Sequence, residues 1–164
     1  MNSLKLTNSL TRKKEVFKPI NSDKITLYAC GPTVYDNPHV GNARSLVIFD
    51  TLFRVLQLLY GGKKVYYVRN ITDVDDKIIE ASKNKKKSIN DITLEVTKIF
   101  HQNCESLNCL KPTQEPKATE HIQEMIEMTS SLIEKKFAYV NEGHVYFSVT
   151  SFKSYGKLSN KNLE

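Results

Sequence analysis

The chain has 164 residues and a hydrophobic fraction of 40%, and its 24 Lys and Arg residues outnumber 18 Asp and Glu residues to give a formal net charge of +6. This composition excludes a disordered or collagen-like chain, and the sequence has no run of about 18 apolar residues that could cross a bilayer. The positive charge favours an anionic partner.

The N-terminal segment and the cysteines indicate the cellular compartment of the protein. Residues 1–20 carry Lys and Arg but lack the apolar stretch of a secretory signal. The three cysteines, Cys30, Cys104 and Cys109, form an odd number that favours free thiols or metal ligands over a disulfide framework. We therefore expect a cytoplasmic protein that does not associate with membranes.

The first half of the chain has the pattern of a strand, a helix and a second strand. Alternating apolar residues predict a strand over 24–30. Apolar residues then recur at helical spacing over 43–59, and the glycines at 61–62 supply a stop. The β-branched and aromatic segment 64–71 predicts the second strand. Such a βαβ unit implies parallel pairing and a right-handed crossover.

Helices and a hairpin are expected in the second half. The acidic stretch 72–76 is typical of a loop that opens a short helix, and Ser88 with Asp91 resembles a capping box that starts a helix reaching about Leu107. Pro112 and Pro116 interrupt the chain. An amphipathic pattern predicts a further helix over 119–135, and residues 137–140 and 144–149 flank a turn that predicts a β-hairpin.

The predicted elements form an incomplete domain. Two parallel strands make a poor sheet, since parallel sheets need both faces covered and more strands. The tail 151–164 is polar and continues no pattern. We therefore expect an α/β chain that is the front portion of a larger protein.

Three polar clusters follow the predicted strands, where open α/β sheets place their ligands. They are residues 30–33, 39–42 and 70–72. Within the second cluster, Gly41 lacks a Cβ and lets a base or phosphate approach the backbone at a helix start, whose amides favour anions. His39 and Asn42 add polar groups nearby. Taken alone, this cluster is more typical of a surface loop with a helix cap.

Together, several long stretches resemble the N-terminal catalytic region of the cysteinyl-tRNA synthetases, a class I aminoacyl-tRNA synthetase family. The resemblance is carried by CGPTVYD at 30–36, HVGNARS at 39–45 and YVRNITDVDDKI at 67–78. It extends to NSLTRKKEVFKPI at 8–20, LKPTQEPKATEHI at 110–122 and YGKLS at 155–159. It implies a Rossmann-like nucleotide-binding fold, with residues 1–136 as the first half of the catalytic domain and residues 137–164 as the beginning of an inserted connective domain.

The resemblance implies a first step in which ATP, with Mg²⁺, and L-cysteine form cysteinyl-adenylate. It also implies a second step that transfers the aminoacyl group to tRNA(Cys). The family's HIGH signature corresponds here to His39-Val40-Gly41-Asn42. It assigns ATP binding to Pro32, His39, Gly41 and Asn42, of which the last three are the expected catalytic residues. Asn42 stands where the literal signature has a second His, and it keeps an amide hydrogen bond. No protein nucleophile is required, so catalysis rests on positioning and on stabilising phosphate charge.

Selection of cysteine against serine is difficult for a shaped pocket, because the two differ by one atom. A zinc ion with an open position reads sulfur directly. The resemblance implies such a zinc, with Cys30 as its first ligand and the other ligands beyond residue 164. We expect the 164 residues alone to hold zinc poorly, to fold marginally and not to aminoacylate.

The expected substrate-binding residues surround Cys30. Thr33 and Thr72 resemble the residues that bind the amino acid or the adenylate. Backbone contacts are expected from Gly31, Asn70 and Ile71, and Ser45 is a weaker candidate for the same pocket. Turn or cap duty is the alternative for the Thr, Ser and Asn residues.

Other polar residues have plainer interpretations. Asp73, Asp75 and Asp76 could suggest a magnesium site, but capping is preferred. Structural roles are expected for Cys104 and Cys109. Surface or core roles are expected for the remaining histidines, which are His101, His121 and His144.

Two other functions remain open from the sequence. A related ligase joins cysteine to an amino-sugar inositol with the same motifs and the same zinc logic but without tRNA. A noncatalytic basic module that binds RNA is the more distant alternative, and salt-sensitive binding without protection by ATP or cysteine would be its mark.

Overall fold

The computed structural model describes residues 3–161, and its contacts divide the chain into two compact units. One unit is Ile20–His121, and the other combines Met1–Pro19 with Ile122–Glu164. Among the described residues, no helix has both the length and the apolar character needed to cross a membrane. The domain boundary expected at residue 136 stays a prediction.

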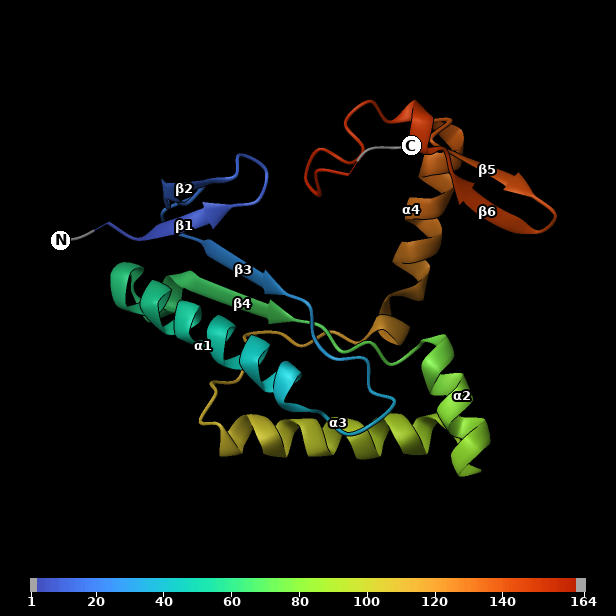
Figure 1. The fold of residues 1–164 in the computed structure, drawn as a ribbon, viewed down its shortest axis with the longest axis horizontal. Helices are drawn as coiled ribbons and strands as arrows, with labels where there is room; N and C mark the ends of the chain where they lie inside the picture. Colours follow the sequence, from blue (N-terminus) through green and yellow to red (C-terminus); the bar gives the residue numbers. More distant parts are fainter. Residues whose placement is uncertain (1–2, 162–164) are drawn as a thin grey trace. The chain divides into compact units, whose positions relative to one another are not determined.

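The unit Ile20–His121 is built on the predicted βαβ element (Figure 1). Strand β3 (Ile25–Ala29) is followed by helix α1 (Val40–Tyr60), a 3₁₀ turn (Gly62–Lys64) and strand β4 (Val65–Arg69). The two strands pair in parallel from Ile25 opposite Val65 to Ala29 opposite Arg69, which confirms the predicted pairing. Alternate residues of both strands are buried, because successive side chains point to opposite faces.

Helix α1 covers one face of the strand pair. Its buried side includes Leu46, Phe53 and Leu56, and the ring of Phe53 lies 5.2 Å from the ring of Tyr67 on β4. The helix ends at Gly61, whose φ of 91° is readily adopted only by glycine, as the sequence predicted. It begins three residues earlier than predicted, since His39 caps it and the polar first turn shows no apolar period.

A third segment joins the sheet beside β4, and the sequence did not predict it. Residues Gln114 and Lys117 form parallel bridges with Val68 and Ile71. The Arg69 N–H donates to the Gln114 carbonyl at 3.1 Å, and the Ile71 N–H donates to the Pro116 carbonyl at 2.9 Å. Pro116 has no N–H, so the segment cannot form a regular strand, although its carbonyl still accepts.

Two helices connect β4 with this third segment. They are α2 (Asp76–Lys85) and α3 (Ile89–Ser106), and α3 begins at the predicted cap, where the Asp91 N–H donates to the Ser88 hydroxyl at 3.1 Å. The apolar face of α3 lies in the main core. The core consists of Val34, Leu46, Ile71, Ile78, Ile92, Val96, Phe100 and Cys104.

The other unit contains a hairpin that was missed and two elements that were predicted. Strands β1 (Lys5–Asn8) and β2 (Lys13–Val16) pair antiparallel. Both are short, basic and largely exposed, so they carry no apolar alternation that a sequence pattern could reveal. Helix α4 (Ile122–Glu134) and the hairpin of β5 (Ala138–Asn141) and β6 (His144–Phe147) confirm the predicted helix and hairpin.

The backbones of the first two strands come unusually close just beyond their ends. The Gly31 N–H donates to the Asn70 side-chain oxygen at 3.0 Å. A Cβ atom built on Gly31 would lie 1.5 Å from the backbone oxygen of Asn70. No side chain fits there, so Gly31 is required by close approach of two backbones and not by an unusual φ angle.

A charged cluster ties the third segment to β4 and α3. Arg69, which is 4% exposed, donates through Nε and Nη2 to Oε1 of Glu115 at 3.0 and 2.7 Å. Nε2 of His101 lies 2.5 Å from Oε2 of the same carboxylate. Burial by itself would lower the pKa of Arg69. The hydrogen bonds that Arg69 donates to Glu115, together with other nearby groups, outweigh burial, so the pKa is raised. Arg69 therefore stays charged and depends on Glu115 for its compensation.

We expect Gly31→Ala to lower the free energy of unfolding by at least about 2 kcal/mol, because the added methyl group meets a backbone carbonyl that cannot move aside. Urea unfolding of the purified chain measures this loss. Gly62→Ala is the matched control, because its nearest neighbour would be a flexible Gln57 side-chain nitrogen at 3.8 Å. Equal unfolding midpoints for the two variants would contradict the close approach.

We expect Glu115→Ala to cost about 3–5 kcal/mol of unfolding free energy, because it leaves the buried Arg69 charge without a partner. Glu95→Ala is the control, since it removes an exposed ion pair with Lys87 and should change stability little. Thermal or urea unfolding of both variants gives the comparison. A loss no larger than that of the control would show that Arg69 does not need Glu115.

Candidate functional site

The first and third polar clusters meet at the ends of β3 and β4, as predicted. Thr33 and Thr72 form a parallel bridge. The Val34 N–H donates to the Thr72 carbonyl at 3.1 Å, and the Thr72 N–H donates to the Pro32 carbonyl at 3.0 Å. The sheet pairing thus resumes beyond the close approach at Gly31 and places two threonines side by side, both half-buried.

The Asn70 side chain holds this junction together. Its oxygen accepts from the Gly31 N–H and from the Tyr28 hydroxyl, each at 3.0 Å, and its nitrogen donates to Oγ1 of Thr72 at 3.0 Å. Asn70 therefore fixes the Thr72 side chain and the Gly31 backbone at once. No sequence pattern marks Tyr28 as a site residue, since it lies at an exposed strand position.

Ile71 lies under the junction, buried to 1% exposure. Its N–H donates to the Pro116 carbonyl, and its carbonyl accepts from the Ala118 N–H at 3.0 Å. Both backbone groups are thus engaged by the third segment of the sheet. The expected backbone contact between Ile71 and a substrate stays a prediction.

The second cluster forms the first turn of α1. Nδ1 of His39 accepts from the Gly41 N–H at 3.1 Å, and the Asn42 side-chain oxygen accepts from the His39 N–H at 3.0 Å. This is a reciprocal capping box in which Asn42 supplies the returning acceptor. His39 and Gly41 are exposed, and a Cβ on Gly41 would lie 2.7 Å from the His39 ring. The cap and the positive end of α1 thus coincide with the expected phosphate site.

One small pocket joins the first and second clusters. The residues that line it include Cys30, Gly31 and Pro32 from the end of β3 and Asn42 and Ser45 from the start of α1. Its apolar wall is made by Leu46, Phe49, Tyr67 and Phe100, with Ala29 and Arg69 completing it. Five of the predicted site residues therefore surround one space. The other six predicted site residues do not line this pocket; they are Thr33, His39, Gly41, Asn70, Ile71 and Thr72.

Cys30 is not a core residue. It is exposed at the mouth of this pocket, whereas Cys104 is buried and Cys109 is half-buried. A thiolate is a suitable ligand for zinc. Within residues 3–161, no three or more His, Cys, Asp or Glu side chains are grouped to hold a metal ion. The role of Cys30 as a zinc ligand stays a prediction.

The acidic stretch after β4 serves the local structure. Asp75 caps α2, because its side chain accepts from the Lys77 N–H at 2.9 Å, and Asp76 is the first helical residue. Asp73 accepts from the Thr119 N–H at 3.0 Å and from the Thr119 hydroxyl at 2.6 Å. The preferred interpretation of capping is confirmed for Asp75.

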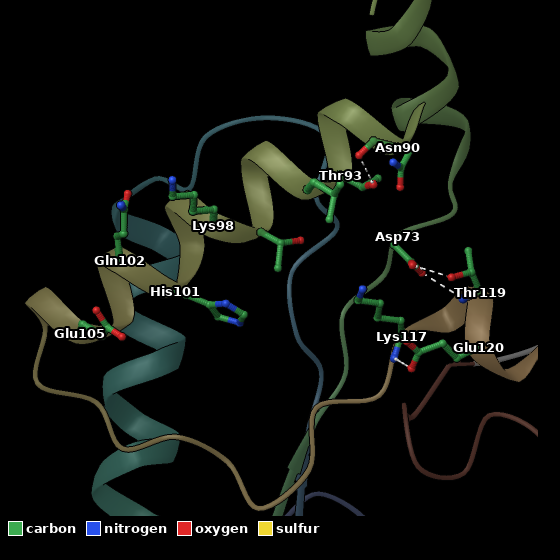
Figure 2. A pocket seen from close by; sticks show the side chains of 12 residues that line it. Asp73, Asn90, Thr93, Lys98, His101, Gln102, Glu105, Lys117, Thr119 and Glu120 are labelled. Carbon is green, nitrogen blue, oxygen red and sulfur yellow. Dashed lines mark hydrogen bonds between the residues drawn. The ribbon is translucent and has the colours of Figure 1, made fainter. Parts of the chain in front are cut away.

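A larger pocket lies elsewhere (Figure 2). It has a volume of about 500 Å³ between one face of α3 and the loop around Thr119. Figure 2 shows Asp73 pointing toward Thr119, and His101 and Lys98 extending from α3. None of the predicted site residues line it. Its ionisable lining has both signs, with Asp73, Lys98, His101, Glu105, Lys117 and Glu120. The pocket next to Cys30 remains the candidate site.

Comparison with known proteins shows the family to which the chain belongs. Residues 16–164 match the family model described as the tRNA synthetases class I (C) catalytic domain. The chain is 61% identical over 159 residues to a cysteine–tRNA ligase of Pelagibacter ubique (strain HTCC1062), covering 97% of this chain and 35% of that protein. It is 56% identical over 161 residues to a cysteine–tRNA ligase of Rickettsia prowazekii (strain Madrid E), covering 98% of this chain and 35% of that protein.

A cysteine–tRNA ligase of Wolbachia pipientis subsp. Culex pipiens (strain wPip) is 54% identical over 161 residues, which cover 98% of this chain and 34% of that protein. The chain therefore spans about a third of the length of these relatives. With a family model that matches most of its residues and with strand ends that assemble the expected clusters, the chain belongs to the family of class I (C) tRNA synthetase catalytic domains.

Proposed function

We propose that the protein containing this chain is a cytoplasmic ligase that activates L-cysteine with ATP and transfers it to tRNA(Cys). The observation that carries the proposal is the pocket between β3 and α1, where the exposed Cys30 thiol lies with Asn42 and Ser45. A thiol-directed site beside a helix start suits a reaction that joins a thiol-bearing amino acid to a nucleotide.

The start of α1 is the proposed ATP site. The positive end of the helix favours phosphate oxygens, and the first-turn residues Val40 and Gly41 are exposed. In the proposed reaction a carboxylate oxygen of cysteine attacks the α-phosphorus of ATP, and pyrophosphate leaves with the electron pair of the broken bond. His39 would face the phosphates and Gly41 the adenine, with Pro32 and Asn42 completing the ATP site, and Mg²⁺ would offset the charge of the phosphates.

The threonine pair is the proposed site for the amino acid or the adenylate. Thr33 and Thr72 lie on paired backbones, and Asn70 donates to the Thr72 hydroxyl oxygen. That bond leaves the Thr72 hydroxyl proton free to point at a carboxylate or phosphate oxygen. Gly31 and Ile71 would add backbone groups, and Ser45 lines the wall opposite Cys30.

Cys30 is the proposed first ligand of a zinc ion that selects sulfur. A bound zinc would lower the pKa of a substrate thiol and hold it as thiolate, which serine cannot match. Cys30 would occupy one coordination position of the zinc, and other residues of the full-length protein would supply the remaining ligands. The zinc ion would supply the discrimination between cysteine and serine that the shape of a pocket alone does not give.

We expect Cys30→Ser in the full-length protein to lose most of its bound zinc and to select cysteine over serine less strongly, because a hydroxyl is a poor zinc ligand. Metal analysis after gel filtration gives the zinc content, and pyrophosphate exchange with each amino acid gives the selectivity. Cys109→Ser is the control, since that thiol lies away from the Cys30 pocket. Unchanged zinc content in Cys30→Ser would remove Cys30 from the metal site.

We expect Thr72→Val to lower kcat/KM for cysteine in pyrophosphate exchange by roughly ten- to a hundredfold, the value of a hydrogen bond to a charged group. The variant keeps the shape of the side chain. Thr51→Val is the control, because its hydroxyl donates to the Val47 carbonyl on an exposed part of α1. Equal kcat/KM values in Thr72→Val and in the control would show that the hydroxyl does not contact a substrate.

A further inference from the structure

Two cysteines occupy special positions in the turn that ends α3. The C-cap is Leu107, and Asn108 has a left-handed φ of 53°. The Cys109 N–H donates to the Cys104 carbonyl, and the Asn108 N–H donates to the Glu105 carbonyl, each at 2.9 Å. These two bonds define a Schellman motif, in which the side chains at the positions of Cys104 and Cys109 commonly touch.

The backbone bond limits the separation of the two residues. With standard bond lengths, an N···O distance of 2.9 Å keeps the Cα atoms within about 6.8 Å of each other. Disulfides join Cα atoms that are usually about 4.4 to 6.8 Å apart. Cys109 also packs against the apolar cluster to which Cys104 belongs. The Cα atoms of Cys104 and Cys109 are therefore within the usual separation for a disulfide.

The residues on both sides of Cys109 are fixed to α1. Nη2 of Arg54 donates to the Asn108 carbonyl at 2.6 Å, and the Leu110 N–H donates to Oδ1 of Asp50 at 2.7 Å. Arg54 and Asp50 are themselves paired at 2.7 Å. The residues before and after Cys109 are thus fixed in place. This limits the conformational entropy that the chain loses when the Cys109 sulfur bonds to Cys104.

Both thiols are reachable from solvent through one pocket. Cys104, Cys109, Arg69 and Pro112 are among the residues that line a hollow of about 250 Å³. Cys104 is 6% exposed and Cys109 is half-buried, so a reagent meets Cys109 first. Burial raises the pKa of both thiols, and the Arg69 charge opposes that rise. Reaction is therefore slow but favoured by mildly basic conditions.

We propose that Cys104 and Cys109 are a modification site that closes to an intramolecular disulfide when the protein meets a small disulfide such as oxidised glutathione. The Cys109 thiolate attacks one sulfur of the reagent, and one glutathione thiolate leaves. The Cys104 thiolate then attacks the Cys109 sulfur and expels the second glutathione. Two protein thiols are oxidised, one glutathione disulfide is reduced to two thiols, and the protons lost by the cysteines pass to the leaving thiolates.

The test uses the reduced full-length protein and oxidised glutathione at about pH 8, close to the pKa of an ordinary thiol. After an acid quench, free thiols are alkylated, and trypsin releases residues 99–117 as one peptide, because Lys111 precedes Pro112. The peptide holds Cys104 and Cys109 and no other cysteine. We expect it to be two hydrogen atoms lighter, without alkyl group or glutathione, and to regain both thiols with dithiothreitol.

Single-cysteine variants separate the two steps. In Cys104→Ala, Cys109 should stop as the mixed disulfide with glutathione, and in Cys109→Ala, the buried Cys104 should remain a free thiol. Cys30 lies in a different tryptic peptide, residues 25–44, and does not enter this readout. A wild-type peptide that keeps glutathione on Cys109, or that is alkylated at both positions, overturns the proposal.

The turn itself can be tested at Asn108. Asn108→Gly keeps the left-handed φ and should close the disulfide at the wild-type rate. Asn108→Val disfavours that φ and should slow the second step about tenfold. Circular dichroism confirms that both variants are folded. If Asn108→Val closes as fast as Asn108→Gly, the Schellman motif does not align the thiols and the proposal fails.

Discussion

Two backbones meet at Gly31 and Asn70 with no room for a side chain between them, and the candidate site depends on this contact. The contact brings the end of β3 beside the end of β4 just where their regular pairing stops. Beyond it the pairing resumes at Thr33 and Thr72. The Asn70 side chain bonds to the backbone of Gly31 and to the hydroxyl of Thr72, and it thereby links the two strand ends. The polar residues after the two strands are therefore held at one edge of the sheet.

The start of α1 is positioned against this edge by its own cap. The His39 side chain accepts a hydrogen bond from the Gly41 N–H, and the Asn42 side chain accepts one from the His39 N–H. Both side chains therefore stabilise the first turn of α1. This does not conflict with a role toward phosphates. The capping bonds use Nδ1 of His39 and the oxygen of Asn42, and they leave Nε2 of His39 and the amide nitrogen of Asn42 for a ligand.

The sheet edge is buttressed from the far side by the segment around Glu115. This segment is paired with β4 and is joined to it by the buried Arg69. Arg69 also lines the pocket of Cys30 and the pocket of Cys104 and Cys109. The same guanidinium thus lies between the candidate site and the thiol pair.

The sequence alone determined the elements that carry a strong local signal. The strands around Ile25 and Val65, the glycine stop of α1, the Ser88 cap and the hairpin at residues 138–147 all have periodicity or turn chemistry that acts over a few residues. The motifs of residues 30–45 and 67–78 also identified the family, since their order and length carry the resemblance. The β1–β2 hairpin was missed because its polar, exposed strands bury nothing that could mark them.

Only the tertiary structure decided which of these residues share a space. The pairing of the Gln114–Lys117 stretch with β4, the Tyr28–Asn70 bond and the joining of Cys30, Asn42 and Ser45 around one pocket all link residues far apart in the chain. Such contacts leave no local pattern, because they are set by packing between elements and not by the preferences of neighbouring residues.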